Sequence, residues 1–183
     1  MDLFRPAEPT TDPRELLIRA TIEQIEALGP AKVTVRAIVA AAGQNIAAVN
    51  YYFGSKAKLL EVAHQATVAE MLGDTEAVLG RLPQDPQRYL AELLHYYLEG
   101  SRRYPRLSRS HLHAAFTSDD YTGPFPTAFA SVLVRLRDAI VAHVPALTPD
   151  QANRRITRAL SAVLFPALFP DFFAPIPSLD TDL

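Results

Sequence analysis

Two short helical segments separated by three residues constrain this chain more than any other feature of its sequence. Thr34 can cap a helix over residues 35–42, and Gly43-Gln44-Asn45 separates that helix from a second segment, Ile46–Phe53. The first segment has an apolar face with i, i+3, i+4, i+7 spacing, formed by Val35, Ile38, Val39 and Ala42. Two short helices joined by a glycine-containing turn are typical of a helix-turn-helix, whose second helix enters the major groove of DNA.

Cations stand at the start of two helices in this region, where the helix dipole disfavours them. Arg36 lies in the first turn of the helix over residues 35–42, and Lys56 opens the helix that follows Gly54-Ser55. A DNA phosphate would explain both, because helix amides and a cationic side chain can face the same anion. Residues 27–60 contain four basic and no acidic side chains, whereas the whole chain has a formal charge of −2. The sequence therefore predicts a small cationic module on a mildly acidic body.

Apart from Asn50 and Tyr51, the outer face of the segment Ile46–Phe53 is small and flat. Val49 and Phe53 are spaced to pack inward, which leaves Ala47, Ala48, Asn50 and Tyr51 on another side, as suits a helix that approaches base edges closely. Of the aromatic triplet at 51–53 only part can be buried, so at least one tyrosine should be exposed.

The rest of the chain reads as helices, with no alternating strand pattern. A first helix should run from Asp12-Pro13 to Gly29-Pro30. Longer helices are expected from Lys56 to about Leu72, from Asp85-Pro86 to Tyr104-Pro105, over Leu107–Phe116, over Pro126–Val144, and from Thr148 to about Phe165, where Pro166 should kink or end the last one. The predicted fold class is all-α: an N-terminal three-helix helix-turn-helix domain and a C-terminal helical bundle.

Composition excludes several classes of function. The 183 residues are 49% hydrophobic and 21% charged, as in an ordinary folded protein. The absence of cysteine excludes disulfide scaffolds, thiolate metal sites and cysteine nucleophiles. The first residues lack the pattern of a signal peptide, and the longest uncharged stretch, residues 37–55, is too polar for a membrane span. We expect a cytoplasmic protein without a membrane association.

The motif segments resemble a known family. Residues 34–43, TVRAIVAAAG, followed by NIAAVNYYFGSK over residues 45–56 and Leu59-Leu60, are similar to the DNA-binding domain of the TetR family of transcriptional regulators. The similarity covers roughly residues 13–68. It implies an all-helical, cytoplasmic repressor that is not an enzyme and has no cofactor, binds an operator in double-stranded DNA as a homodimer through its last two long helices, and is released by a small apolar or amphipathic organic effector.

The resemblance also implies roles for particular residues. Thr34 and Arg36 would contact the DNA backbone or adjacent bases, Asn50 and Tyr51 would face the groove, and Tyr52 and Lys56 would hold phosphates. The recognition helix would start with Asn45, Ile46, Ala47 and Ala48. Ile46 has two interpretations, because its spacing from Val49 and Phe53 would bury it while the resemblance points it at DNA; we favour the second. The chain departs from the usual family pattern at Val39, Gln44, Asn50 and Tyr52, so base preference cannot be read from it.

The expected domains are a flexible arm at residues 1–11, the helix-turn-helix domain at 12–55, an effector-binding and dimerisation domain at 56–170, and a tail at 171–183. A dimer surface is expected on Phe129–Ile140 and Ile156–Leu168. Aromatic or polar groups on apolar faces are candidates for lining the effector pocket: Tyr97, Ser101, His113, Phe116, Phe129 and Leu133.

Other patterns have two interpretations each. The five histidines lack metal-ligand spacing, so we expect neutral, hydrogen-bonded side chains and no metal. The arginines at 102, 103, 106 and 109 either hold an anionic effector or, as we favour, form a solvated helix end. The phenylalanines at 165, 169, 172 and 173 either cap the chain's own core or wrap a partner subunit. The alternative function is a helical small-molecule-binding protein or enzyme that does not bind DNA.

Overall fold

The structure is a computed structural model that describes residues 9–144 and 146–175. These residues form helices and no strands, which confirms the predicted all-α class. The helices are α1 (Pro13–Leu28), α2 (Val35–Ala42), α3 (Ile46–Phe53), α4 (Lys56–Leu79), α5 (Pro86–Arg103), α6 (Pro105–His111), α7 (His113–Ser118), α8 (Pro124–His143), α9 (Pro149–Leu168) and α10 (Pro170–Phe173). Most of the predicted arm and the end of the predicted tail, at residues 1–8 and 176–183, lie outside the described residues.

The chain divides into two compact units. One comprises the chain up to Asp74 together with Arg106–Ala130, and the other comprises Thr75–Pro105 with the chain from Ser131 onward. The first unit thus holds α1–α3, most of α4, α6, α7 and the start of α8. The domain boundaries expected at residues 11, 55 and 170 separate regions by their expected function, not by packing, and they remain predictions.

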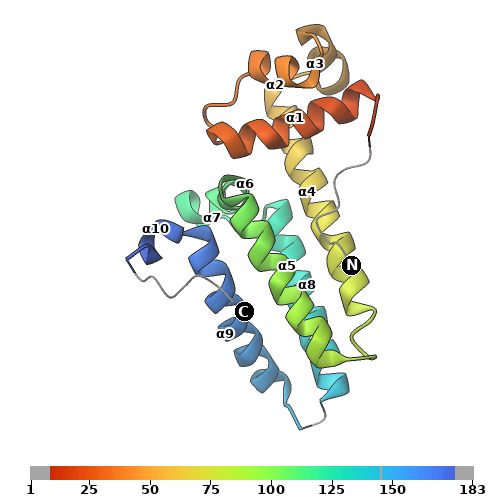
Figure 1. Cartoon of the computed structure of the whole chain (residues 1–183), viewed down its shortest axis with the longest axis vertical. Helices are drawn as coiled ribbons and strands as arrows, with labels where there is room; N and C mark the ends of the chain where they lie inside the picture. The colour runs from red at the N-terminus through yellow and green to blue at the C-terminus, as the bar shows by residue number, and fades with distance from the viewer. Residues whose placement is uncertain (1–8, 145, 176–183) are drawn as a thin grey trace. The chain divides into compact units, whose positions relative to one another are not determined.

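Local side-chain caps explain where the first three helices begin. The side chain of Asp12 accepts a hydrogen bond from the Arg14 amide at 3.0 Å, and Pro13 occupies the first helical position. α1 packs on both α2 and α3, and the three lie together beside the start of α4 (Figure 1). The largest fully buried side chains of this unit are Leu17, Thr21, Ile25, Val33, Ile38, Val49 and Leu59. The core of the first unit therefore holds the helix-turn-helix by its apolar faces.

The second unit is built on the pairing of α5 with α9, which run side by side, and α10 packs on α9 (Figure 1). Its buried side chains include Val78, Leu82, Leu93, Val132, Ala152, Ile156 and Leu160. The hydroxyl groups of Thr75 and Tyr97 lie 2.9 Å apart in a hydrogen bond inside this core, so neither buried polar group is left unsatisfied.

Two predicted helix boundaries are wrong, and one of the two outcomes expected at Pro166 is excluded. α4 continues past Leu72 to Leu79, because Thr75 and Val78 are buried and their packing outweighs the poor helix propensity of Gly73. Pro166 does not end α9, which runs on to Leu168, so of the two outcomes expected at Pro166 only a kink stays a prediction. The proline removes a donor only in the last turn, and Ala167 beyond it is buried.

The stretch expected as one helix over Leu107–Phe116 is two helices, α6 and α7. The Leu112 amide donates to the Arg109 carbonyl three residues back, at 3.1 Å, which tightens and ends α6. α7 then starts at His113 without a side-chain cap.

Candidate nucleic-acid interface

The turn between α2 and α3 depends on one backbone conformation. Gly43 has φ 62° and ψ 30°, the left-handed region that a residue with a Cβ adopts only at a cost. This conformation lets the Gln44 amide donate to the Val39 carbonyl at 2.8 Å and closes the end of α2. The chain then reaches the start of α3 within two residues, as the predicted helix-turn-helix requires.

Thr34 and Asn45, both predicted to contact DNA, are the N-caps of α2 and α3. Thr34 Oγ1 accepts from the Ala37 amide at 3.1 Å, and Asn45 Oδ1 accepts from the Ala48 amide at 3.0 Å. Each cap uses a side-chain oxygen as acceptor. The hydroxyl hydrogen of Thr34 and the amide hydrogens of Asn45 are separate donors, which a phosphate oxygen can accept.

α3 buries Val49 and Phe53 and turns its other side to solvent. Ile46 is 47% exposed, so the interpretation that would bury it with Val49 and Phe53 is wrong. The remaining predicted groove-facing residues are also accessible: Ala47, Asn50 and Tyr51 are exposed and Ala48 is half-buried. The outer face of α3 therefore combines small side chains with one amide and one large aromatic.

Tyr51 is 82% exposed and Tyr52 is 37% exposed, in line with the expectation that at least one tyrosine lies outside the core. Their rings meet edge to face with centroids 4.9 Å apart. Such edge-to-face contacts between aromatic rings are favourable by about 0.5–1.5 kcal/mol. Two hydroxyl groups are thereby presented near the C-terminal end of α3.

Cations flank this helix on neighbouring elements. Arg36 is exposed in the first turn of α2, and Lys56 is half-buried at the start of α4. Ser55 precedes α4, and its side chain accepts from the Lys58 amide at 3.1 Å. The ammonium group of Lys58 pairs with Glu61 at 2.7 Å, which offsets its charge. Arg36 and Lys56 are thus the stronger candidates for phosphate contacts.

Arg14 is a candidate that the sequence reasoning missed. It is exposed in the first turn of α1, and its guanidinium lies over the Phe53 ring, 5.6 Å from the ring centroid. This contact brings a third cation to the C-terminal end of α3. The signal was present in the sequence, because Arg14 opposes the dipole of α1 just as Arg36 opposes that of α2.

The six candidate effector-lining residues do not come together in one unit. Tyr97, Ser101 and Leu133 belong to the second unit, where the first two are buried and Leu133 is half-buried. The other three, His113, Phe116 and Phe129, belong to the first unit, where His113 and Phe116 are exposed. The effector site remains a prediction.

His64 and His111 are hydrogen-bonded and favour the neutral state, as predicted. A His64 ring nitrogen lies 2.8 Å from Ser110 Oγ, and a His111 ring nitrogen lies 3.0 Å from Thr67 Oγ1. Burial lowers the pKa of His64, and burial together with the neighbouring His64 lowers the pKa of His111 to about 4. Within residues 9–144 and 146–175, no three metal-ligating side chains gather into a site.

The helices of the described chain include none that is long and apolar enough to cross a bilayer. The described helices include a capped helix-turn-helix near the N-terminal end, with an exposed outer face on α3 and cations in the first turns of the neighbouring α2 and α4. This arrangement defines a helix-turn-helix protein of the DNA-binding class.

The family match is more specific. Residues 17–63 match the family described as "Bacterial regulatory proteins, tetR family". This segment is therefore a TetR-type DNA-binding domain, which confirms the resemblance drawn from the motif residues. The matched family consists of regulatory proteins, so residues 17–63 carry the DNA-binding domain of a transcription regulator.

Two solved structures share the fold across most of the chain. One is a candidate transcriptional regulator from Streptomyces coelicolor A3(2), with a TM-score of 0.62 and 22% identity over 85% of this chain and 87% of that one. The other is the fatty acid degradation regulator FadR from Bacillus halodurans, with a TM-score of 0.66 and 16% identity over 90% of this chain and 89% of that one. No curated protein matches the sequence.

Proposed function

We propose that this regulator is a repressor that binds a palindromic DNA operator as a homodimer and is released by a small organic effector. The observation that supports DNA binding most directly is the exposed outer face of α3, which is held on a capped helix-turn-helix whose neighbouring helices α2 and α4 begin with cations. A helix that buries one face and exposes small side chains together with an amide and a phenol can present apolar and hydrogen-bonding groups to base edges in the major groove.

The residues divide into two roles in this proposal. Arg36 and Lys56 neutralise phosphates, with Thr34, Asn45 and Tyr52 donating hydrogen bonds to the backbone. Ile46, Ala47, Ala48, Asn50 and Tyr51 face the bases, with Ile46 against a thymine methyl. Phosphate contacts set affinity and its salt dependence, whereas base contacts set discrimination.

The test starts with selection of a duplex from a random-sequence library by the unmodified protein. Arg36→Ala and Lys56→Ala should weaken binding to every duplex and lower the slope of log K against log salt by about one unit each. Tyr51→Ala should leave the slope unchanged and reduce the preference for the selected duplex over an unrelated one. Arg88→Ala, an exposed arginine of α5, is the control and should change neither quantity.

Failure to enrich any duplex, with no salt-dependent binding at moderate salt, would contradict the proposal. It would favour the alternative of a helical small-molecule-binding protein.

The effector would be an apolar or amphipathic organic molecule that binds in the C-terminal domain. α4 is one helix of 24 residues that begins with Lys56 and ends at Leu79, so it belongs to both compact units. A continuous helix is a physical route for coupling, because displacement of one end reorients the other.

Reciprocity of coupling tests this effector hypothesis. A compound found by thermal-shift screening should bind the free protein about 5–150-fold more tightly than the operator-bound protein in calorimetric titrations. Equal affinities in the two titrations would mean that the compound is not an inducer, and failure across a broad library would contradict ligand gating.

A further inference from the structure

α1 and α6 are joined by a reciprocal set of hydrogen bonds between residues some eighty positions apart. The carboxylate of Glu26, in the last turn of α1, accepts from the backbone amides of Arg106 and Leu107 at 3.0 Å each. In return, the Arg106 guanidinium donates to the Glu26 carbonyl at 3.1 Å and to the Ala27 carbonyl. We call this set the Glu26–Arg106 lock.

Each half of the lock satisfies the end of the other helix. The amides at the start of α6 and the carbonyls at the end of α1 have no partners within their own helices. A carboxylate at the first and a guanidinium at the second also complement the two helix dipoles. Charge-assisted hydrogen bonds of this kind are stronger than neutral ones, so the lock defines how α1 meets α6.

α6 is also tied to α4, through the bonds of Ser110 to His64 and of His111 to Thr67. α1 precedes the helix-turn-helix in the chain and α4 follows it, so α6 bridges the two helices that frame the motif. α1 packs on α2 and α3 directly. A change in the hydrogen bonds between α6 and α1 would therefore change the position of the recognition helix α3, because α1 packs on it.

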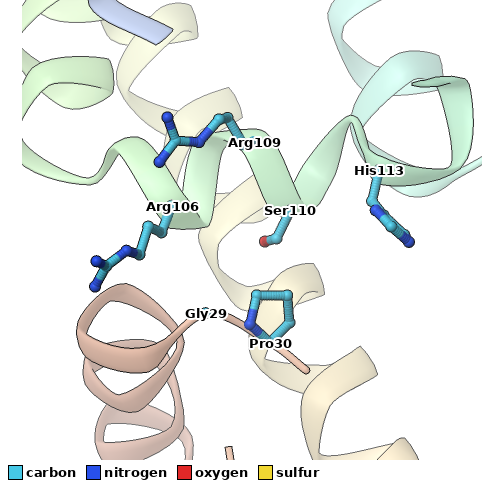
Figure 2. Close-up of a pocket in the computed structure, with 6 residues that line it drawn as sticks. All are labelled: Gly29, Pro30, Arg106, Arg109, Ser110 and His113. Atoms are coloured by element: carbon cyan, nitrogen blue, oxygen red, sulfur yellow. The ribbon is translucent and has the colours of Figure 1, made fainter. Parts of the chain in front are cut away.

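The side chains of Glu26 and Arg106 can separate from their partners without leaving a charge buried and unpaired. Arg106 is exposed and Glu26 is half-buried. Beside them lies a small hollow of about 180 Å³, open to solvent, whose lining is drawn in Figure 2: Gly29, Pro30, Arg106, Arg109, Ser110 and His113. In that view Arg106 reaches toward the last turn of α1. Water can hydrogen-bond both side chains if they separate, so neither would be left without a partner.

We propose that Glu26 and Arg106 are positioning residues for DNA binding, which hold α1 and with it α3 in the orientation that fits the operator. The assignment rests on the proposed DNA-binding function. It adds two residues that do not belong to the predicted DNA-contacting set.

The test measures binding to the duplex selected by the unmodified protein, using the full chain and fluorescence anisotropy. Glu26→Gln and Arg106→Gln should each weaken affinity about tenfold, with the salt slope unchanged because no phosphate contact is lost. The double variant should lose less than the product of the two losses, because both halves hold the same pair of helices. Arg103→Gln, an exposed arginine near the end of α5, is the matched control and should bind normally.

Thermal unfolding of each variant checks the fold. Arg106→Lys keeps the positive charge but loses the planar guanidinium, so it should lower the affinity for the duplex by an intermediate factor of about three. If a glutamine variant unfolds, Arg106→Lys is compared with the unmodified protein in its place. Unchanged affinity of Glu26→Gln and Arg106→Gln would overturn the assignment of these two residues as positioning residues. If the glutamine variants unfold, unchanged affinity of Arg106→Lys would overturn it. In either case, weakened binding by Arg36→Ala would still support the proposed DNA binding. A salt slope lowered by one in Arg106→Gln would make Arg106 a phosphate contact instead. No binding by the unmodified protein would overturn both proposals.

Discussion

At the scale of single residues, the helix-turn-helix depends on side chains and backbone angles that act within a few positions. Thr34 and Asn45 start α2 and α3 by accepting amide hydrogen bonds, and Gly43 supplies the positive φ that the turn requires. The two capping residues are also predicted to contact DNA. The same side chains can do both because capping uses an oxygen lone pair and phosphate binding uses a hydrogen.

Gly43 and Gly73 should respond to alanine in opposite directions. A Cβ would meet no neighbouring atom at either position, so only backbone conformation separates them. Gly43→Ala should lower the free energy of unfolding by about 1 kcal/mol because φ is 62° there. Gly73→Ala, inside α4, should raise it by about 0.5–1 kcal/mol.

Urea unfolding at equilibrium measures both changes. A stabilised Gly43→Ala would show that the left-handed turn is not needed for the folded state.

At the scale of elements, the packing of α6 on α4 favours the neutral state of two histidines, His64 of α4 and His111 of α6, because it removes both rings from water. The rings of His64 and His111 lie with centroids 4.9 Å apart, and His111 stacks on Phe125 of α8. Protonating either ring places a charge in this apolar contact, and protonating both places two like charges side by side. The packing of α6 on α4 is therefore coupled to pH.

The free energy of unfolding should fall as the pH is lowered from about 6.5 to about 4. Burial lowers the pKa of His111 from 6.5 to about 4 and lowers the pKa of His64 in the same direction. Between these values the unfolded chain binds more protons than the folded chain, so acid favours unfolding. For His111 alone the loss should amount to about 2–3 kcal/mol.

Urea titrations at pH 7.5 and pH 5 test this dependence, with His111→Gln as the comparison. The variant should show a flatter pH profile than the unmodified protein. Identical profiles would show that His111 does not titrate between the folded and unfolded states.

At the scale of the whole molecule, α8 and α9 carry apolar side chains that remain exposed among the described residues. Val134 is 46% exposed on α8, and Phe165 is exposed on α9. Leu160, within the predicted dimer surface, is instead buried in the second unit, where α9 packs on α5. A charge at Leu160 would therefore disrupt the fold, and Val134 is the better probe of the proposed dimer.

Val134→Glu should convert the proposed dimer to a monomer without unfolding it, because an exposed charge cannot be desolvated at an apolar interface without a partner. Sedimentation at micromolar concentration measures the change. Arg88→Glu, at an exposed position of α5 outside both predicted dimer segments, is the control and should remain dimeric. A monomeric unmodified chain would contradict the dimer.

The sequence by itself determined the features that depend on near neighbours. The caps at Asp12, Thr34 and Asn45, the turn at Gly43 and the inward pair Val49 and Phe53 all follow from residues within one or two helical turns. Local hydrogen bonds and backbone angles decide them, and the motif residues carry the family resemblance for the same reason.

Only the tertiary structure decided the rest. It extended α4 beyond Gly73 by burying Thr75 and Val78, brought Arg14 over Phe53, and joined Glu26 to Arg106 across the chain. These contacts join residues far apart in the sequence, or depend on packing between helices, and no local pattern specifies which distant partner a side chain meets. Burial and long-range hydrogen bonds form only when the helices pack, so their energies are absent from any single segment.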